Sequence, residues 1–474
     1  MVRTSPLRGG GLEFKSRPAH QKGEQMMDEA YKKAVNLVIK NIQKAGRYIT
    51  AFNTNIDAIV KVNSTSLRIN KKTEEYIKKS LSSGFKREIW KIEDLYLALF
   101  LSIKRGKADE WLISRKEVYD DIAKRFSPIE LRMGGQAGIM ANVLGALGVE
   151  TIVHCAILSE EQCSLFEKNV YAVRKMNGEY KVVPVKDAAK KGIYSTYNWI
   201  FEFAKGTEFK TETLQAIAPR DNRFIATWDP KNSKMEIDKD FKDGICGLLK
   251  NVEWFVVSGY QLLRERYNGE TYADRIKESV SLLKEIRKKG VKIHLELAST
   301  HSLKIRREIV KKVFPVIDSL GFNEVEMTSF MEAMSKKVID EHDSVSLYTG
   351  ISEIMKKYGN IRRVHAHDLG YYLAITKNYL PTEILRDSLL FSSTLAATKA
   401  IHGRVTRKNI KDGLDTPISE RGKEMIKKLS NHLNDENFES SWCMELNGKS
   451  LSAIATKVVK NPVSTVGLGD TISI

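Results

Sequence analysis

The chain has 474 residues, of which 42% are hydrophobic and 8% aromatic, ordinary values for a globular protein with one large α/β domain and a smaller one. No apolar run approaches the roughly 20 residues that a membrane-spanning helix needs, and the N-terminus lacks the apolar core of a signal peptide. The four cysteines form no C-x-x-C pair, which argues against disulfide and zinc frameworks. These features predict a cytoplasmic protein without a membrane partner.

The formal charge of +18 raises the question of a nucleic-acid partner. The lysines are spread along amphipathic segments such as residues 276–289, where they form solvated faces. The sequence has no basic stripe with the interleaved aromatics on which single-stranded nucleic acid stacks. We therefore expect no nucleic-acid partner, and a positive field would also attract an anionic nucleotide.

In chain order, the first expected elements are an extension, a helix and a strand. Residues 1–28 hold three consecutive glycines, scattered charges and little apolar content, so we expect a disordered extension. An amphipathic helix is predicted over residues 29–44, and the run 48–52 is typical of a buried strand.

Two polar segments of the N-terminal half are candidates for binding sugar hydroxyls. Asn53, Asn55 and Asp57 stand at alternate positions after the first strand, so an extended backbone points them to one side. Gly135 and Gln136 lie in a glycine-rich turn before an apolar helix. Amides, carboxylates and exposed N–H groups can pair with hydroxyls. The alternative for the second segment is an ordinary strand-to-helix turn.

Residues 60–130 and 160–225 are richer in charge and in short alternating segments, such as 180–185 and 197–203. We assign both to a smaller domain that interrupts the main sheet as a lid.

The region after residue 250 alternates apolar runs with helical periodicity. Strands are predicted over 254–257, 291–297 and 313–317, with helices over 276–289 and 302–312 between them. This order is typical of βαβ units in a parallel sheet, where ligands bind beyond the carboxyl ends of the strands.

Hard oxygen ligands follow two of these strands. Glu296 ends one strand on the same face as His294, and Asn323 and Glu326 stand three apart at the start of a predicted helix. Carboxylates and amides suit Mg²⁺, which accompanies phosphates. The alternatives are a solvated strand end for the first pair and a helix-capping box for the second.

The run Gly467-Leu468-Gly469-Asp470 near the C-terminus combines a tight turn with a carboxylate. Backbone N–H groups at such a turn can hold phosphate oxygens, while the aspartate could take a proton from a hydroxyl nucleophile. Phosphoryl transfer to an alcohol requires both groups. The alternative is a glycine turn that merely begins a helix.

These motifs, in this order, resemble those of the archaeal and animal ADP-dependent sugar kinases over about residues 45–474. The matching stretches are NTNIDAIV, MGGQAGIMAN, DNRFIA, HLELAS, GFNEVEM, RVHAHDLGYYLA and PVSTVGLGD. The resemblance implies a ribokinase-like parallel-sheet core with a smaller α/β lid. It also implies transfer of a phosphoryl group from ADP, with Mg²⁺ or another divalent cation, to glucose or fructose 6-phosphate. We expect a monomer.

The resemblance also implies roles for individual residues. Asp470 would be the general base, Arg223 would meet the nucleotide phosphates, and Gly467, Leu468 and Gly469 would form the anion hole. Glu296, Glu326 and Asp470 would be associated with the metal. The nucleotide would contact Asn323, His367, Val459 and Gly469. The sugar would contact Asn55, Asp57, Glu110, Gly135, Gln136 and Asn198.

Three positions bear on which sugar is used. Glu110 resembles a glutamate of the glucokinases, and such a carboxylate would favour neutral glucose over an anionic sugar phosphate. Ala204 stands where phosphofructokinases usually carry a basic residue. Asn198, in contrast, resembles the phosphofructokinase-like members. A glucokinase is the first reading, with a phosphofructokinase or a bifunctional enzyme as the alternative.

Two departures from the family pattern leave other functions open. The printed sequence ends at Ile474, whereas family members usually continue with a helix, so a sugar-binding homologue with impaired catalysis is one alternative. Asp368 stands where threonine is common, which could alter adenosine contacts. An ATP-dependent sugar kinase of ribokinase type would share the glycine–aspartate run, but such enzymes usually lack the two glutamate motifs.

Overall fold

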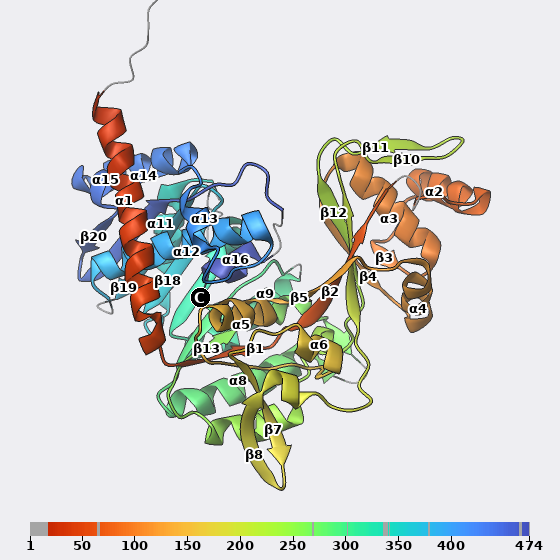
Figure 1. The fold of residues 1–474 in the computed structure, drawn as a ribbon, viewed down its shortest axis with the longest axis horizontal. Coiled ribbons are helices and arrows are strands. Elements are labelled where there is room, and N and C mark those ends of the chain that lie inside the picture. Colours follow the sequence, from red (N-terminus) through yellow and green to blue (C-terminus); the bar gives the residue numbers. More distant parts are fainter. Residues whose placement is uncertain are drawn as a thin grey trace, which may run out of the picture.

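The structure, a computed structural model, describes residues 18–63, 67–267, 270–300, 302–334, 340, 342–377, 380–463 and 467–473. The fold is α/β, with one sheet of eleven strands and a second of six strands in a smaller part of the molecule (Figure 1). In the part of the chain that the structure describes, no helix combines the length and the apolar character needed to cross a membrane.

The large sheet has the strand order β20-β21-β19-β18-β17-β16-β13-β1-β6-β7-β8. Its parallel strands are β1 (Arg47–Ala51), β6 (Thr151–Val153), β7 (Val170–Met176), β13 (Val252–Val257), β16 (Lys292–Glu296), β17 (Ser319–Asn323) and β18 (Arg363–His367). Antiparallel strands flank them: β8 (Glu179–Pro184), β19 (Tyr371–Lys377), β20 (Cys443–Leu446) and β21 (Lys449–Ala455). All carboxyl ends of the parallel strands therefore face one edge, where α/β folds bind ligands.

The helices outside the smaller part are α1 (Pro18–Asn41), α5 (Gln136–Ala146), α6 (Glu160–Ser164), α7 (Lys239–Gly244), α8 (Tyr272–Lys288), α9 (Leu303–Lys312), α10 (Glu324–Ala333), α11 (Ser344–Lys357), α12 (Thr382–His402), α13 (Ile410–Leu414), α14 (Glu420–Leu433), α15 (Asn437–Ser441) and α16 (Leu468–Ile472). The central strands are apolar on both faces because helices cover both. Phe255, Ile293 and Leu320 accordingly lie fully buried in the largest core cluster.

The smaller part is built on a mixed sheet of order β3-β4-β12-β9-β2-β5. Its strands are β2 (Asn55–Lys61), β3 (Glu88–Ile89), β4 (Asp109–Ile113), β5 (Glu130–Gly134), β9 (Tyr197–Phe203) and β12 (Asn222–Thr227), with helices α2 (Lys71–Ser83), α3 (Ile92–Arg105) and α4 (Lys116–Arg125). A hairpin of β10 (Glu208–Lys210) and β11 (Gln215–Ile217) lies beside them, and the pair β14 (Arg266–Tyr267) and β15 (Glu270–Thr271) precedes α8. Trp111, Trp199 and Phe224 centre a separate core cluster here.

The element boundaries differ from the sequence expectations at three places. The extension expected over residues 1–28 is helical from Pro18 onward as part of α1, and residues 1–17 lie outside the described ones. β7 and β8, placed with the lid, pair with the large sheet instead. The strand expected over residues 313–317 is wrong: Phe314–Val316 is a 3-10 helix, and the strand begins at Ser319. Pro315 has no N–H to donate to a sheet, which explains this difference.

Candidate active site

The carboxyl-terminal edge of the large sheet gathers the chemistry-bearing side chains of four strands. Asn53 follows β1, Glu296 ends β16, Asn323 ends β17 and His367 ends β18. The short helix α16 lies at the same edge, because the ideal Cβ position of Gly469 is 2.9 Å from His367 Nε2. The fold therefore brings the glycine–aspartate run to the ends of the strands that carry the predicted metal and nucleotide residues.

The glycine turn begins α16 with Gly467 as its N-cap, at φ +68°. The first intrahelical bond runs from the Thr471 N–H to the Gly467 carbonyl, at 3.1 Å. The N–H groups of Leu468, Gly469 and Asp470 precede that bond and have no partner within the helix. They can donate hydrogen bonds to an anion, as the anion-hole prediction requires. Residues 464–466 of the motif lie outside the described ones.

Three carboxylates share this edge: Asp470, Glu296 and Glu326. Burial and the charges of Glu326 and Asp470 hold the pKa of Glu296 well above its ordinary value. Burial raises the pKa of Glu326 to about 7, and the Asp470 charge adds to the effect. The pKa of Asp470 is raised by burial and lowered by Lys399 and by a hydrogen bond from Gln136.

The three carboxylates repel one another when ionised, and a bound cation would reduce that repulsion. A divalent cation therefore fits this donor set, and Glu296, Glu326 and Asp470 are the residues that would hold it or its waters. The solvated strand end considered for His294 and Glu296 is wrong, because both side chains are almost fully buried.

Asn323 and Glu326 form a capping box at the start of α10. The Asn323 side chain accepts from the Glu326 N–H at 2.9 Å, and the Glu326 carboxylate accepts from the Asn323 N–H at 2.9 Å. The capping alternative is thus confirmed. Each side chain uses one oxygen on the backbone, so the metal role of Glu326 stays a prediction that needs its remaining lone pairs.

Two histidines join Glu296 in a group that sequence analysis did not assemble. Glu296 Oε2 lies 3.2 Å from His294 Nε2 and 3.7 Å from His365 Nε2, and the potential ligand atoms of all three lie within 4.8 Å of one another. Burial lowers the pKa of both histidines well below the ordinary value. Neutral imidazoles are the form that binds metals. The signal in the sequence was His365 two residues before the predicted nucleotide residue His367.

The register of the small sheet places the predicted sugar residues on one face. Asp57 pairs with Asn198, Asn198 with Thr227, and Glu110 with Ile225, two residues from Thr227. Paired residues of neighbouring strands point to the same side, and so do residues two apart on one strand. Arg223, four residues before Thr227, joins the same face. The opposite face carries the aromatic core of the smaller part.

Asp57 is the centre of this polar face. It is buried, and it accepts a hydrogen bond from Asn55 Nδ2 at 2.8 Å. Burial raises its pKa to about 7; the Glu110 charge adds to this, while Asn55, Arg223 and Lys399 oppose it. Residues far apart in the sequence thus shift the pKa of one carboxyl group.

The other sugar candidates surround Asp57 or link it to the large sheet. Glu110 Oε1 accepts from Thr227 Oγ1 at 2.6 Å, and the half-buried Asn198 has a side-chain oxygen without a partner among the described residues. The Gln136 amide donates to the Leu297 carbonyl at 3.1 Å and accepts from Gln261 at 2.9 Å. Gly135 adopts φ +74°, and a Cβ there would lie 2.7 Å from Asn55 Oδ1.

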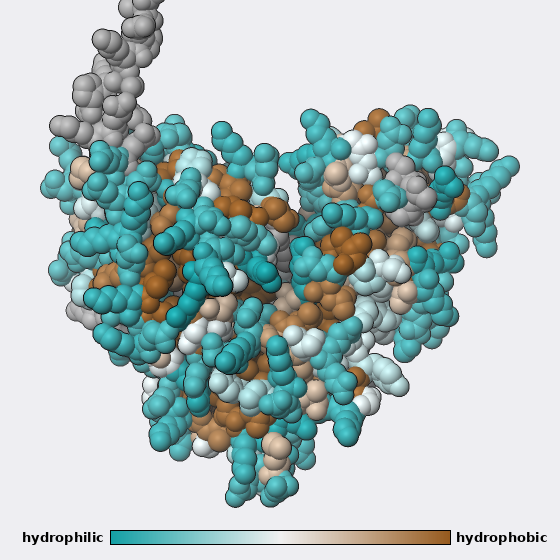
Figure 2. All heavy atoms as spheres, in the orientation of Figure 1, coloured by the Kyte–Doolittle hydropathy of each residue, from teal (hydrophilic) through white to brown (hydrophobic). Residues whose placement is uncertain are grey.

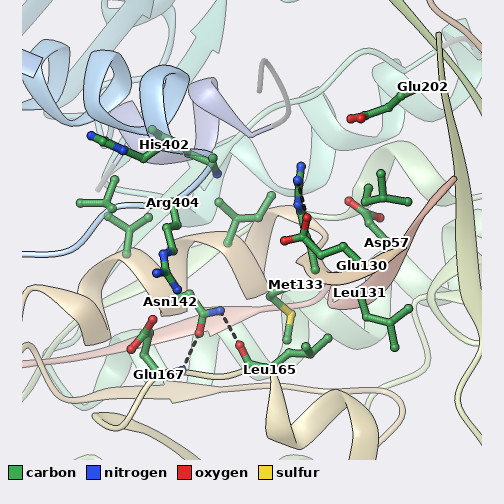
Figure 3. A pocket seen from close by; sticks show the side chains of 17 residues that line it. Asp57, Glu130, Leu131, Met133, Asn142, Leu165, Glu167, Glu202, His402 and Arg404 are labelled. Carbon is green, nitrogen blue, oxygen red and sulfur yellow. Dashed lines mark hydrogen bonds and ion pairs between the residues drawn. The ribbon is translucent and has the colours of Figure 1, made fainter. Parts of the chain in front are cut away.

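A cavity of about 620 Å³ opens between the two parts of the molecule (Figure 3). Figure 2 shows the surface hollowed between them. Asp57, Glu130 and Glu202 line the cavity from the small sheet, and Lys399, His402 and Arg404 from the end of α12 and the loop after it. Sequence analysis missed Glu202 and Lys399, because each lies in an ordinary strand or helix pattern without a motif.

At the nucleotide end, burial lowers the pKa of His367 to about 4, and its Nδ1 atom has no partner among the described residues. Val459 lies half-buried in the segment between β21 and α16. Asp368, the departure noted above, is paired with Arg421 through two bonds of 2.8 and 2.9 Å. Its carboxylate charge is therefore neutralised within the protein.

Comparison of the sequence with known proteins identifies one family. A family model described as "ADP-specific Phosphofructokinase/Glucokinase conserved region" matches residues 46–474. An ADP-dependent glucose/glucosamine kinase of Pyrococcus furiosus is 35% identical over 458 residues, which cover 94% of this chain and 96% of the relative. An ADP-specific phosphofructokinase of Methanosarcina acetivorans is 32% identical over 447 residues, 89% and 90% of the two chains.

Solved structures agree with the sequence comparisons. The last common ancestor of ADP-dependent phosphofructokinases from Methanosarcinales superposes with a TM-score of 0.80 at 30% identity, covering 94% of this chain and 96% of the other. An ADP-dependent kinase in complex with fructose-6-phosphate and ADPβS gives a TM-score of 0.77 at 30% identity, with the same coverage.

Proposed function

The chain belongs to the family of ADP-specific phosphofructokinases and glucokinases, and we propose that it is an ADP-dependent glucokinase that transfers the β-phosphoryl group of ADP to the 6-hydroxyl of glucose. The observation that carries the proposal is the polar face of the small sheet, where the Glu110 charge acts on the buried Asp57 and Lys399, which donates to the Gly467 carbonyl of the glycine turn, acts on Asp57 as well. The products are glucose 6-phosphate and AMP.

The site contains a group for each part of the transfer. The hydroxyl oxygen attacks the β-phosphorus while Asp470 accepts its proton, and the bond to the α-phosphate oxygen breaks. The N–H groups of the α16 turn bind the transferring oxygens, and Arg223 supplies a fixed positive charge from the small sheet. When bound, a divalent cation neutralises charge on the phosphates.

Glucose is favoured by the carboxylates near Asp57, although Arg132, Lys399 and Arg404 line the same cavity. The Glu110 charge acts on Asp57, and Glu202 and Glu130 line the adjoining cavity. A second phosphate would meet these carboxylates, whereas the hydroxyls of neutral glucose can donate to them. Asn198 pairs with Asp57 in the sheet and bears a side-chain oxygen without a partner among the described residues, so it suits either sugar and keeps fructose 6-phosphate as the second candidate.

Steady-state kinetics with both sugars test the choice through Glu110. Glu110→Gln keeps the shape and the Thr227 contact but removes the charge, so we expect kcat/KM for glucose to fall about 10- to 100-fold, the worth of a charge-assisted hydrogen bond. The value for fructose 6-phosphate should stay level or rise. Parallel losses for both sugars would show that Glu110 supports the fold instead. Replacing ADP with ATP separates this function from an ATP-dependent kinase, since we expect no turnover with ATP.

A further inference from the structure

Lys399 is a buried lysine at the end of α12 that none of the motifs includes. Only 6% of its surface is exposed. Its ammonium group donates to the Gly467 carbonyl at 3.1 Å, the residue that begins the anion-binding turn. Since α12 also packs against α16, the lysine joins a long core helix directly to the catalytic turn.

The position of the ammonium group is fixed by two independent observations. A Cβ built on Gly467 would lie 2.7 Å from Lys399 Nζ and 3.1 Å from Asp470 Oδ2. The ammonium group and the Asp470 carboxylate therefore both lie next to Gly467. Lys399 also lines the cavity that contains Asp57. The ammonium therefore lies near the predicted base, and the lysine belongs to the wall of the cavity that contains the predicted sugar-binding carboxylate.

The hydrogen bonds of Lys399 are incomplete. An ammonium group has three donors, and the one acceptor that the described residues place within hydrogen-bond distance is the neutral Gly467 carbonyl. Within those residues no carboxylate lies close enough for an ion pair, although Asp470 and Asp57 both exert an attractive charge. Burying a charge with so few partners is costly unless a ligand supplies them.

The lysine is also charged at neutral pH. Burial lowers its pKa to about 8, and the two carboxylates oppose that effect. Two N–H donors of a cation are thus left beside the turn that would hold the phosphate, on a residue that lines the cavity.

We propose that Lys399 is a further catalytic residue, whose ammonium group binds the β-phosphoryl group in transit between ADP and the acceptor hydroxyl. The inference rests on the proposed kinase function and adds a residue to it. A fixed cation at this point stabilises the charge spread over the transferring oxygens without reorganisation. It contacts the β-phosphate, which ADP has and AMP lacks.

Binding and turnover of four proteins test the proposal: wild type, Lys399→Met, Lys399→Arg and Lys377→Met. Lys377 is a matched control, because it also donates to backbone carbonyls but lies at the end of β19 away from His367. In Lys399→Met we expect ADP to bind about 10-fold more weakly and kcat to fall about 10-fold or more, while AMP binds within about 2-fold of wild type. Lys399→Arg should recover part of both losses, and Lys377→Met should match wild type.

The outcomes separate the two proposals. Equal weakening of ADP and AMP, or normal kcat in Lys399→Met, would overturn the role of Lys399 while leaving the kinase function intact. A wild type that binds ADP but phosphorylates no sugar would overturn the proposed function, and the ADP-to-AMP comparison would still decide whether Lys399 recognises the β-phosphate.

Discussion

At the scale of single residues, the candidate site contains buried carboxyl groups that resist ionisation. Burial raises the pKa of both Asp57 and Glu326 to about 7. An acid that binds its proton more tightly when folded stabilises the protein at low pH and loses that contribution as pH rises through the folded pKa. The ligand-free protein should therefore lose stability between about pH 4 and pH 7.

Asp57→Asn tests this linkage. The variant keeps the hydrogen bond from Asn55 but has no charge, so its free energy of unfolding should exceed that of wild type above pH 7 and match it near pH 4. Between these limits the difference should grow by about 1.4 kcal/mol per pH unit. Urea unfolding at a series of pH values measures it, and parallel curves for the two proteins would contradict the assigned pKa.

Glu296 and Glu326 are predicted to organise a divalent cation. Glu326→Gln can keep the α10 capping box, since glutamine accepts at the same helix position, so the variant should fold normally. It should nevertheless need several-fold more Mg²⁺ for half-maximal rate, and Glu296→Gln should behave in the same way. Glu332→Gln, in the same helix but paired with Arg306, is the control. A lower melting temperature with unchanged Mg²⁺ dependence would mean that the two carboxylates serve the fold alone.

At the scale of elements, the glycine turn before α5 lets the backbone pass close to the predicted sugar residues. Gly135 and Gly192 both have φ +74°, but only Gly135 is crowded: a Cβ there would lie 2.6 Å from the Asn53 carbonyl. Replacement by alanine should cost each protein roughly 1–2 kcal/mol of backbone strain. Gly135→Ala should in addition displace Asn55 and raise KM for the sugar about 10-fold, the loss of one good hydrogen bond.

Sugar titrations and melting curves of the two alanine variants separate these effects. Gly192→Ala should bind sugar as wild type does, because nothing lies within 4 Å of its added Cβ. Equal sugar affinities for both variants would show that the turn at Gly135 does not shape the sugar site.

The sequence predicted elements well where periodicity was strong. The strands at 48–52, 254–257 and 291–297 and the helices at 276–289 and 302–312 are confirmed as β1, β13, β16, α8 and α9. It failed at residues 313–317, where an apolar run contains a proline, and at β7 and β8, whose alternating pattern fits an edge of either sheet. Sheet membership depends on tertiary pairing, which local pattern does not encode.

The sequence predicted the site residues that lie in motifs and missed those that lie outside them. Residues in motifs, such as Asp470 and Asp57, lie where the two polar clusters form. Lys399, His365 and Glu202 were missed because they become neighbours of the site only through packing of α12, β18 and β9. Their types and spacing in the chain resemble those of any core helix or strand.

At the scale of the whole molecule, the residues of the proposed reaction are divided between the two sheets. The large sheet and α16 carry the predicted base, the glycine turn and the predicted metal carboxylates. The small sheet carries Asp57, Glu110 and Arg223 on one face, and Asp57 lines the cavity (Figures 1 and 3). Among the described residues, neither part alone carries all the side chains to which the proposed transfer assigns a role. Approach of the small sheet would bring Arg223 to the phosphates and exclude water from the transfer.

Phosphorus NMR of the protein with ADP, Mg²⁺ and glucose tests the central claim most directly, because it follows both products of the transfer. The account predicts that the β-phosphate signal of ADP disappears while glucose 6-phosphate and AMP appear in equal amounts. In Asp470→Asn the same conversion should be at least about 100-fold slower, as expected for loss of a positioned base. ADP that persists with glucose and with fructose 6-phosphate, or conversion at the wild-type rate in Asp470→Asn, would contradict the account.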